Sequence, residues 1–344
     1  MLRRWLVVGL LIVMLTLPSC TPLTGFTDSA RPDRRAQELA VIVNQSDPLS
    51  VKIAQYYQAQ RHIPAENMIV VRFAPNQTAL TPQQFQALKA QVDAKTPARV
   101  QGYALTWAAP YQVGCMSITA AFAFGFDQKY CATGCRLTAT NAYFNQDSTQ
   151  PFADFKVRPT MALAATNFAQ AQALIDRGIV ADGTRPAGTA YLITTTDKAR
   201  NVRSQLYPGI QRLLAEQFPI QVLPTEALAQ KPDVMFYFTG LSQVQKLPTN
   251  RFLPGAIGDH LTSFGGMLTN SGQMSSLRWL EAGATGSYGA VVEPCNFLQK
   301  FPHPGIVIYY YLKGNTLLQA YWKSVQQPGQ GIFIGEPLAQ PFGP

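Results

Sequence analysis

Short apolar runs alternate along the chain with segments whose apolar residues recur at helical spacing. Residues 39–43 are apolar without interruption, which is typical of a strand buried on both faces of a sheet. Asp47 and Pro48 follow, and an N-cap residue before a proline predicts the start of a helix. Similar runs predict strands at residues 68–73, 103–107, 161–165, 191–195, 234–238, 261–265, 290–292 and 332–334. This alternation predicts an α/β fold built on doubly wound, mostly parallel sheets.

Particular residues mark where the predicted helices begin and end. Thr81 and Gln84 have the spacing of a capping box, in which each side chain bonds the other residue's backbone amide. The helix predicted at residues 167–177 meets Gly178, and glycine commonly ends helices because it accepts left-handed backbone angles. We therefore expect this helix to stop at Gly178.

A longer helix is expected between residues 197 and 214. Asp197 is placed to begin it, since acidic residues favour the amino end of a helix, and Pro208 predicts a kink. Arg200 and Arg203 fall in the first turns and are interpreted as part of a solvated surface. Shorter helices are predicted at residues 49–57, 275–281, 306–312 and 316–325.

Residues 108–157 interrupt this rhythm. The segment has little periodicity and contains Cys115, Cys131 and Cys135. An ordered loop of this length usually has a function or a covalent staple. The closely spaced Cys131 and Cys135 are the nearest candidates for such a staple.

The first twenty residues have the pattern of an export signal. Two arginines precede an apolar run at residues 5–17, and the small Ser19 precedes Cys20. This order resembles the bacterial lipoprotein box, in which residues 1–19 are removed and Cys20 is acylated. It predicts a flexible tether at residues 20–36. The alternative is an ordinary secretory signal that contains a cysteine.

The residue after Cys20 bears on the destination of the protein. Thr21 stands where an aspartate would retain a lipoprotein at the inner membrane, which resembles outer-membrane sorting in Gram-negative bacteria. We therefore expect a cell-envelope protein that faces the periplasm and is bound to the membrane through its N-terminal lipid. Several acyl chains give a durable anchor, because each buried methylene contributes about 0.8 kcal/mol.

Length and charge limit the domain organisation and the binding partners that we expect. Removal of the signal would leave 344 − 19 = 325 residues and a formal net charge of 9 − 2 = +7. That length supports one large domain or two lobes of about 150 residues each, which we place at residues 37–185 and 186–344. The basic excess is spread along the chain, so a solvated surface explains it better than a site for anionic lipid or polysaccharide. No nucleic-acid partner is expected, and with only three histidines neither a metal cluster nor another cofactor is expected.

The expected location changes how the other cysteines are interpreted. Cys115, Cys131, Cys135 and Cys295 are four thiols in an oxidising compartment, which predicts two disulfides with three possible connectivities. One alternative is a thiol-redox pair of Cys131 and Cys135, although three residues separate them instead of the usual two. The other is a zinc site, for which a second paired cluster is missing.

Several segments carry a resemblance to known proteins. They are Val43-Asn44, Arg61-His62-Ile63-Pro64, Arg158-Pro159, Leu174-Ile175-Asp176-Arg177-Gly178, Gly255-Ala256-Ile257 and Ala282-Gly283-Ala284-Thr285. Together they resemble a family of uncharacterised bacterial exported proteins and lipoproteins over roughly residues 37–343. The order of the segments is more distantly similar to gingipain-type cysteine peptidases, whose fold is caspase-like.

The resemblance implies two catalytic positions that this chain does not fill. In gingipain-type peptidases one strand ends in Gly-His-Gly, and a later strand ends at the nucleophilic cysteine, before a helix and a Gly-Ala-rich strand. Here Gly240 matches the first glycine but is followed by Leu241, and residues 261–265 contain no cysteine. We therefore expect a non-proteolytic module that binds or scaffolds an envelope ligand or protein.

A cysteine hydrolase is the alternative function. Cys295 lies just beyond residues 290–292, at the carboxyl end of a predicted strand, where doubly wound sheets bind ligands. His260 is the candidate base and Glu293 lies two residues before the thiol, since this chemistry needs a thiolate and a neighbouring proton acceptor. A disulfide at Cys295 and a packing role for His260 are the competing structural interpretations.

Overall fold

The computed structural model describes residues 33–75, 77–132 and 134–344. The predicted signal, Cys20 and most of the expected tether lie outside the described residues. The described residues belong to one compact unit. The first described helix in it is α1 (Arg34–Gln37).

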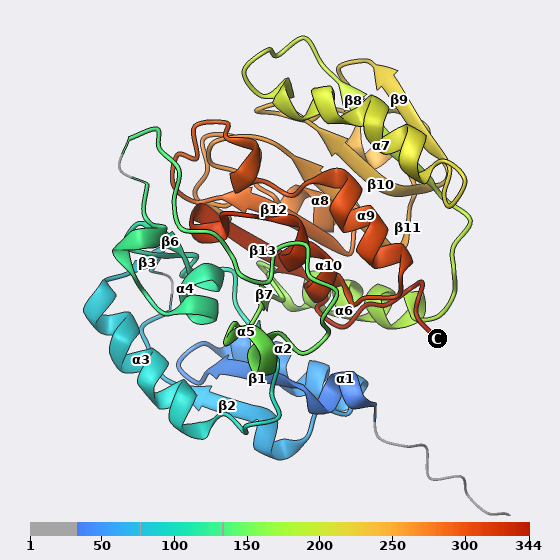
Figure 1. The fold of residues 1–344 in the computed structure, drawn as a ribbon. Helices are drawn as coiled ribbons and strands as arrows, with labels where there is room; N and C mark the ends of the chain where they lie inside the picture. Colours follow the sequence, from blue (N-terminus) through green and yellow to red (C-terminus); the bar gives the residue numbers. More distant parts are fainter. Residues whose placement is uncertain (1–32, 76, 133) are drawn as a thin grey trace, which may run out of the picture. The chain divides into compact units, whose positions relative to one another are not determined.

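A ten-stranded sheet runs through this unit and consists of two sets of five strands (Figure 1). The first set contains, in spatial order, β2 (Met68–Val71), β1 (Leu39–Asn44), β4 (Gly102–Leu105), β7 (Thr160–Ala162) and β13 (Gly331–Gly335). The second set continues with β12 (Gly286–Ala290), β11 (Phe252–His260), β10 (Val234–Thr239), β8 (Thr189–Thr194) and β9 (Ile220–Pro224).

The two sets run in opposite directions. Neighbouring strands are parallel within each set, and among the described strands of this sheet only β12 and β13 pair antiparallel. The carboxyl ends of the two sets therefore lie at opposite edges of the sheet. Since β13 pairs with β7, residues 37–185 and 186–344 contribute strands to one continuous sheet. The predicted α/β class and mostly parallel sheet are confirmed.

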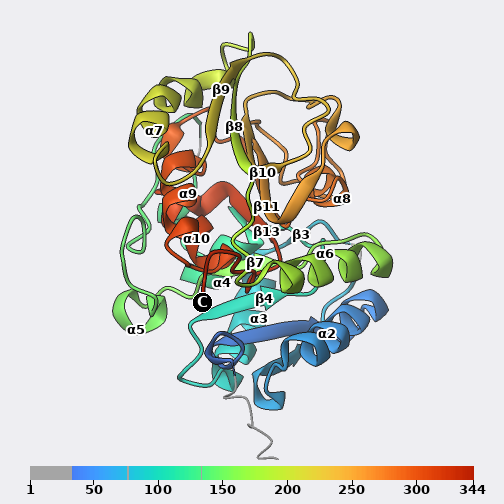
Figure 2. The same cartoon turned by 90° about the vertical axis from the view of Figure 1, so that its right-hand side faces the viewer.

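Helices cover both faces of this sheet, as the predicted doubly wound pattern requires (Figure 2). One face is covered by α2 (Pro48–Arg61), α6 (Phe168–Ala181) and α8 (Leu277–Glu281). The other face is covered by α3 (Pro82–Lys95), α4 (Ile118–Phe124), α7 (Tyr207–Leu214), α9 (Pro304–Leu312) and α10 (Leu317–Ser324).

Several local predictions are confirmed. All six residues of β1 are buried, as a continuous apolar run implies. Asp47 caps α2 by accepting from the amide of Leu49. Thr81 and Gln84 form both bonds of the capping box that begins α3. In these places short-range polar signals were sufficient to place the helix start.

The prediction that Gly178 ends a helix is wrong. Helix α6 continues through it to Ala181. A Cβ at position 178 would come within 2.6 Å of the side chain of Glu336, which is buried against this turn. Gly178 therefore permits a close approach between elements instead of ending the helix.

The long helix predicted from residue 197 is replaced by two shorter elements. A 3₁₀ helix, η3 (Asn201–Leu206), leads directly into α7. Pro208 lies in the first turn of α7, where a missing amide proton costs nothing, so it produces no kink in a continuous helix.

Two strands near the centre of the sheet begin earlier than predicted. Strand β11 ends at His260, whereas residues 261–265 were expected to form it. Strand β12 ends at Ala290, so residues 291 and 292 lie beyond it. Both shifts move the carboxyl ends of these strands, which decides where the candidate site lies.

The segment at residues 108–157 contains short elements instead of one long loop. They are β5 (Gln112–Val113), β6 (Met116–Ser117), α4 and α5 (Pro151–Phe155). Strands β5 and β6 form a small second sheet with β3 (Ala79–Leu80). The segment is thus tied to the fold by backbone pairing as well as by cysteines.

Candidate functional site

The carboxyl ends of β10, β11 and β12 meet at the edge of the sheet where β13 begins. Open α/β sheets usually bind ligands outside the carboxyl ends of their strands. His260 ends β11, and Glu293 and Cys295 follow β12, so all three predicted catalytic residues belong to this edge. We take it as the candidate functional site.

The end of β10 leaves no room for a side chain at Gly240. A Cβ there would overlap the carbonyl oxygen of Arg200. Thr239, the last residue of β10, is completely buried, and its hydroxyl has no hydrogen-bond partner among the described residues. Leu241, where the resemblance implies a histidine, brings no group that can accept a proton.

His260 is enclosed in the protein interior with a solvent-exposed fraction of 1%. The indole Nε1 of Trp279 donates to its Nδ1 at 2.9 Å, and its Nε2 lies 3.0 Å from the carbonyl oxygen of Met274. A carbonyl oxygen only accepts, so Nε2 carries the proton. Burial lowers the pKa of His260 to about 4, and the ring is therefore neutral near pH 7.

Asp259, the residue before His260, belongs to a buried ion pair. Arg203 Nη1 lies 2.5 Å from Asp259 Oδ1, but neither carboxylate oxygen accepts a well-aligned hydrogen bond. Arg203 instead donates to the carbonyl oxygens of Thr239 at 2.8 Å and Pro302 at 3.3 Å. Burial raises the pKa of Asp259, and the positive charge of Arg203 opposes that shift only in part. Charge at close range is therefore the main link between the two side chains.

Arg203 is a residue that the sequence interpretation placed wrongly. It was assigned to a solvated helix start, yet only 1% of it is exposed. Its position relative to Tyr207 and Ile210, which are also buried, is that of one helical face. That spacing was the available signal. Arg203 was misplaced because arginine is rarely buried without an obvious partner nearby in sequence.

The sulfur of Cys295 is joined to Cys135, with Cα atoms 5.3 Å apart, within the range usual for disulfides. The side chain of Glu293 contacts the backbone of Cys295, whose amide donates to Glu293 Oε1 at 2.6 Å. No hydrogen bond of the described residues joins Cys295 to His260. A hydrolase that uses this thiol would first require reduction of the disulfide.

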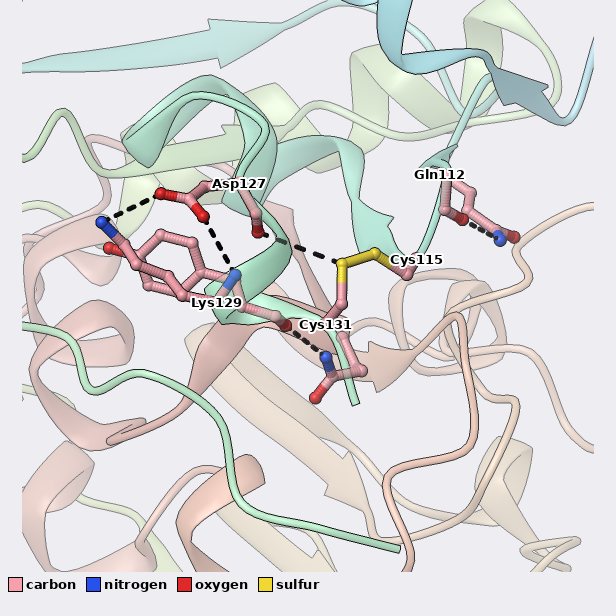
Figure 3. The surroundings of a disulfide bond; sticks show 8 residues. Gln112, Cys115, Asp127, Lys129 and Cys131 are labelled. Atoms are coloured by element: carbon pink, nitrogen blue, oxygen red, sulfur yellow. Dashed lines mark hydrogen bonds and ion pairs between the residues drawn. A yellow bond between two sulfur atoms is a disulfide. The ribbon is translucent and has the colours of Figure 1, made fainter. Parts of the chain in front are cut away.

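The second disulfide joins Cys115 to Cys131, with Cα atoms 5.4 Å apart (Figure 3). Two disulfides were predicted and are confirmed, but the expected staple between Cys131 and Cys135 is wrong. Cys131 follows a 3₁₀ turn whose backbone is fixed by Asp127, and its sulfur is bonded to that of Cys115, the residue before β6 (Figure 3). The two sulfurs of the Cys131–Cys135 segment thus reach different parts of the fold.

A small polar network covers the segment after β11. Arg200, about a quarter exposed, donates to Thr262 at 3.3 Å and pairs with Asp197 at 2.8 Å. Thr262 donates to Gln273 Oε1 at 2.6 Å, and the same oxygen accepts from the amide of Phe264. These contacts fold residues 262–273 back on themselves. They leave one partly exposed cation and no nucleophile–base hydrogen bond among these residues.

In the described part of the chain, no group of three or more histidine, cysteine, aspartate or glutamate side chains is arranged to hold a metal ion. In the same residues, no helix has the length and apolar character needed to cross a membrane.

Comparisons with protein-family models, with curated proteins and with solved structures return no match to this chain.

Proposed function

We propose that the protein is a non-proteolytic binding or scaffolding module of the cell envelope, built on a caspase-like fold and anchored through a lipid on Cys20. The order of elements supports the caspase-like assignment. Strands β10 and β11 are neighbours whose carboxyl ends would present the two catalytic groups, and helix α8 and the glycine-rich strand β12 follow them along the chain.

The burial and hydrogen bonding of His260 are the observation that carries the non-proteolytic proposal. Both of its ring nitrogens are engaged inside the protein. A general base must reach the proton that it removes. A buried imidazole bonded to Trp279 and Met274 serves the packing of β11 against α8.

Thiol labelling of the full chain, purified in detergent without reductant, tests this proposal. We expect no alkylation of Cys295 by iodoacetamide and no cleavage of a mixed-sequence fluorogenic peptide library. The matched variants are Cys295→Ser, which removes the candidate nucleophile, and Cys115→Ser, which opens the other disulfide. Both disulfides should appear in peptide mass maps of the unreduced protein.

The hydrolase alternative predicts the opposite results. Peptide cleavage that appears after mild reduction, disappears in Cys295→Ser and His260→Gln, and persists in Cys115→Ser would replace the binding module with a cysteine hydrolase. Cleavage that is insensitive to all three variants would point to a contaminant and leave Cys295 without a catalytic role.

The membrane anchor is tested separately. Cys20→Ala should move the protein from the membrane fraction to the soluble periplasmic fraction, because acyl chains supply the proposed attachment. A variant that still sediments with the outer membrane would show that Cys20 is not the point of attachment. Incorporation of a labelled fatty acid into the wild type, but not into Cys20→Ala, is the direct readout.

A further inference from the structure

An apolar groove lies between α7 and α9, away from the candidate site. It has a volume of about 340 Å³ and is lined by Ile210, Leu213, Leu214, Gln217, His303, Gly305, Ile306 and Tyr309. Helices α7 and α9 lie side by side in both views of the fold (Figures 1 and 2). The groove runs along the line where the two helices meet.

Two exposed large apolar side chains line this groove. Five such residues are exposed in the described chain, and two of them, Leu213 and Tyr309, line it. Leu213 is 78% exposed, the largest value of the five. An isolated exposed leucine needs no explanation, but one that faces an exposed aromatic across an apolar groove indicates an interaction surface.

The groove continues into a second hollow of different chemistry. This hollow has a volume of about 610 Å³ and shares Gln217 with the first. Phe218, Leu312 and Phe342 form its apolar wall, and it opens at the amino ends of β8 and β10. The two hollows thus meet at Gln217, and the second has a polar end.

Two side chains of opposite charge line the polar end. Asp233 accepts from the hydroxyls of Thr189 at 2.6 Å and Tyr191 at 2.7 Å, which fix the carboxylate without neutralising it. Arg185 is exposed on the loop that precedes β8, and its backbone amide is held by the carbonyl of Pro341. Within the described residues, no ion pair reaches either side chain.

We propose that this groove binds a peptide segment of a partner protein, with apolar side chains between α7 and α9 and a basic side chain beside Asp233. An acidic group of the same segment pairs with Arg185. This arrangement matches a recurring mode of recognition, in which two or three apolar anchors enter a groove and a charged pair fixes the direction of the peptide.

The charges favour a peptide over a membrane lipid as the occupant. An anionic headgroup that approaches Arg185 would also meet the carboxylate of Asp233, which opposes it. A peptide places a cation and an anion on neighbouring residues and satisfies both. This inference deepens the proposed binding role, and it fails separately from it, because the groove does not include the edge that carries His260 and Cys295.

Selection of random twelve-residue peptides by phage display on the full chain in detergent tests the proposal. We expect enrichment of sequences with two apolar residues and a neighbouring lysine or arginine. Synthetic copies of these peptides, labelled with fluorescein, then report affinity by fluorescence anisotropy. Leu213→Glu should raise their Kd at least about tenfold, since it removes a central anchor. Asp233→Asn should raise it about fivefold, and only for peptides with the basic residue.

Val180→Glu is the matched control. Val180 is 63% exposed on α6, outside the groove, so the same change of charge should leave the Kd unaltered. Unchanged circular dichroism melting curves for the three variants show that each remains folded. Failure to enrich any peptide, or equal binding to wild type and Leu213→Glu, overturns the proposal.

Two rival occupants have their own readouts. Flotation with vesicles of phosphatidylethanolamine and phosphatidylglycerol that depends on Leu213 in a Cys20→Ala background would assign the groove to lipid. A dimer in sedimentation velocity that dissociates in Leu213→Glu would assign it to a second copy of the chain. Either result overturns the peptide assignment and leaves the non-proteolytic proposal unaffected.

Discussion

Two buried arginine–carboxylate pairs lie at opposite edges of the sheet, and they are built differently. After β13, Glu336 accepts from Arg61 through both carboxylate oxygens, at 3.1 and 2.6 Å, and from the hydroxyl of Tyr57 at 2.6 Å. Near the end of β11, Asp259 lies against Arg203 without a well-aligned hydrogen bond to either oxygen. Both carboxylates are completely buried.

The difference extends to the surroundings of the two arginines. Arg61 also pairs with Asp182, and although burial works against its charge, the charge of Glu336 holds its pKa above the usual value. Arg203 has only carbonyl oxygens as hydrogen-bond acceptors, and burial raises the pKa of its partner Asp259. A buried ion pair stabilises a fold only when hydrogen bonds offset the cost of desolvation.

The comparison assigns different roles to the two edges. The Arg61–Glu336 pair joins α2 to the residue after β13, 275 positions apart in sequence, and acts as a clamp within the first set of strands. The Arg203–Asp259 pair adds little net stability to the edge where the resemblance implies a catalytic centre. Incomplete polar pairing is therefore concentrated at the candidate site and not at the clamp.

The largest expected effect is the loss of stability when the Arg61–Glu336 pair is broken, compared with the loss of a surface ion pair. Glu336→Gln should lower the free energy of unfolding by about 3–5 kcal/mol, because it leaves a buried guanidinium without its main countercharge. Chemical denaturation measures the change. Glu38→Gln is the control, since Glu38 pairs with the exposed Arg34, and it should cost less than about 1 kcal/mol. Equal losses for the two variants would contradict the clamp.

The next effect concerns the pH dependence of the candidate site. Burial lowers the pKa of His260 from 6.5 to about 4, so its contribution to stability is complete above pH 6.5 and is lost as the pH falls through about 4. The loss should total about 3 kcal/mol. His260→Gln, whose amide can accept from Trp279 and donate to Met274, should remove this pH dependence, whereas His62→Gln should retain it. Denaturation series at several pH values check both.

The smallest effect tests the second ion pair. Asp259→Asn should cost about 2 kcal/mol, because Arg203 loses its countercharge but keeps two carbonyl acceptors, and the desolvation cost of a carboxylate is removed. A loss as large as that for Glu336→Gln would show that the two pairs are equivalent and would remove the contrast between the edges.

Asp259→Asn also tests the direction in which stability changes with pH. Since burial raises the pKa of Asp259 above 3.8, its contribution to stability is complete below pH 3.8 and is lost as the pH rises through the raised pKa. The difference in unfolding free energy between wild type and Asp259→Asn should therefore fall as the pH rises. Asp147→Asn should show the opposite trend, because the bond from Lys313 lowers the pKa of Asp147.

Local signals explain which parts of the fold were predictable. The Asp47 cap and the Thr81–Gln84 box act within three residues, so the sequence is enough to place them. Strand β11 was missed because Pro254, Gly255 and Gly258 usually argue against a strand. Gly258 is required there because a Cβ would overlap the ring of Trp279, a contact that no local pattern encodes.

The sequence indicated which residues belong to the candidate site but not which residues they bond to. Glu293 and Cys295 follow β12, as predicted, whereas His260 was expected to precede a strand at residues 261–265 and instead ends β11. Their partners come from distant segments, since Cys135 is 160 positions from Cys295 and Arg203 reaches Asp259 across the core. Spacing along a chain does not determine such pairings.

The antiparallel contact between β12 and β13 also sets an order of assembly. Residues 331–335 pair with β12 on one side and β7 on the other, at the centre of the sheet. During synthesis the other four strands of the first set and the whole second set can form early, but two inner edges stay open until this last strand is made. Unpaired strand edges invite association with other chains. A nascent chain paused before residue 331 should therefore need a chaperone more than one paused anywhere within either set.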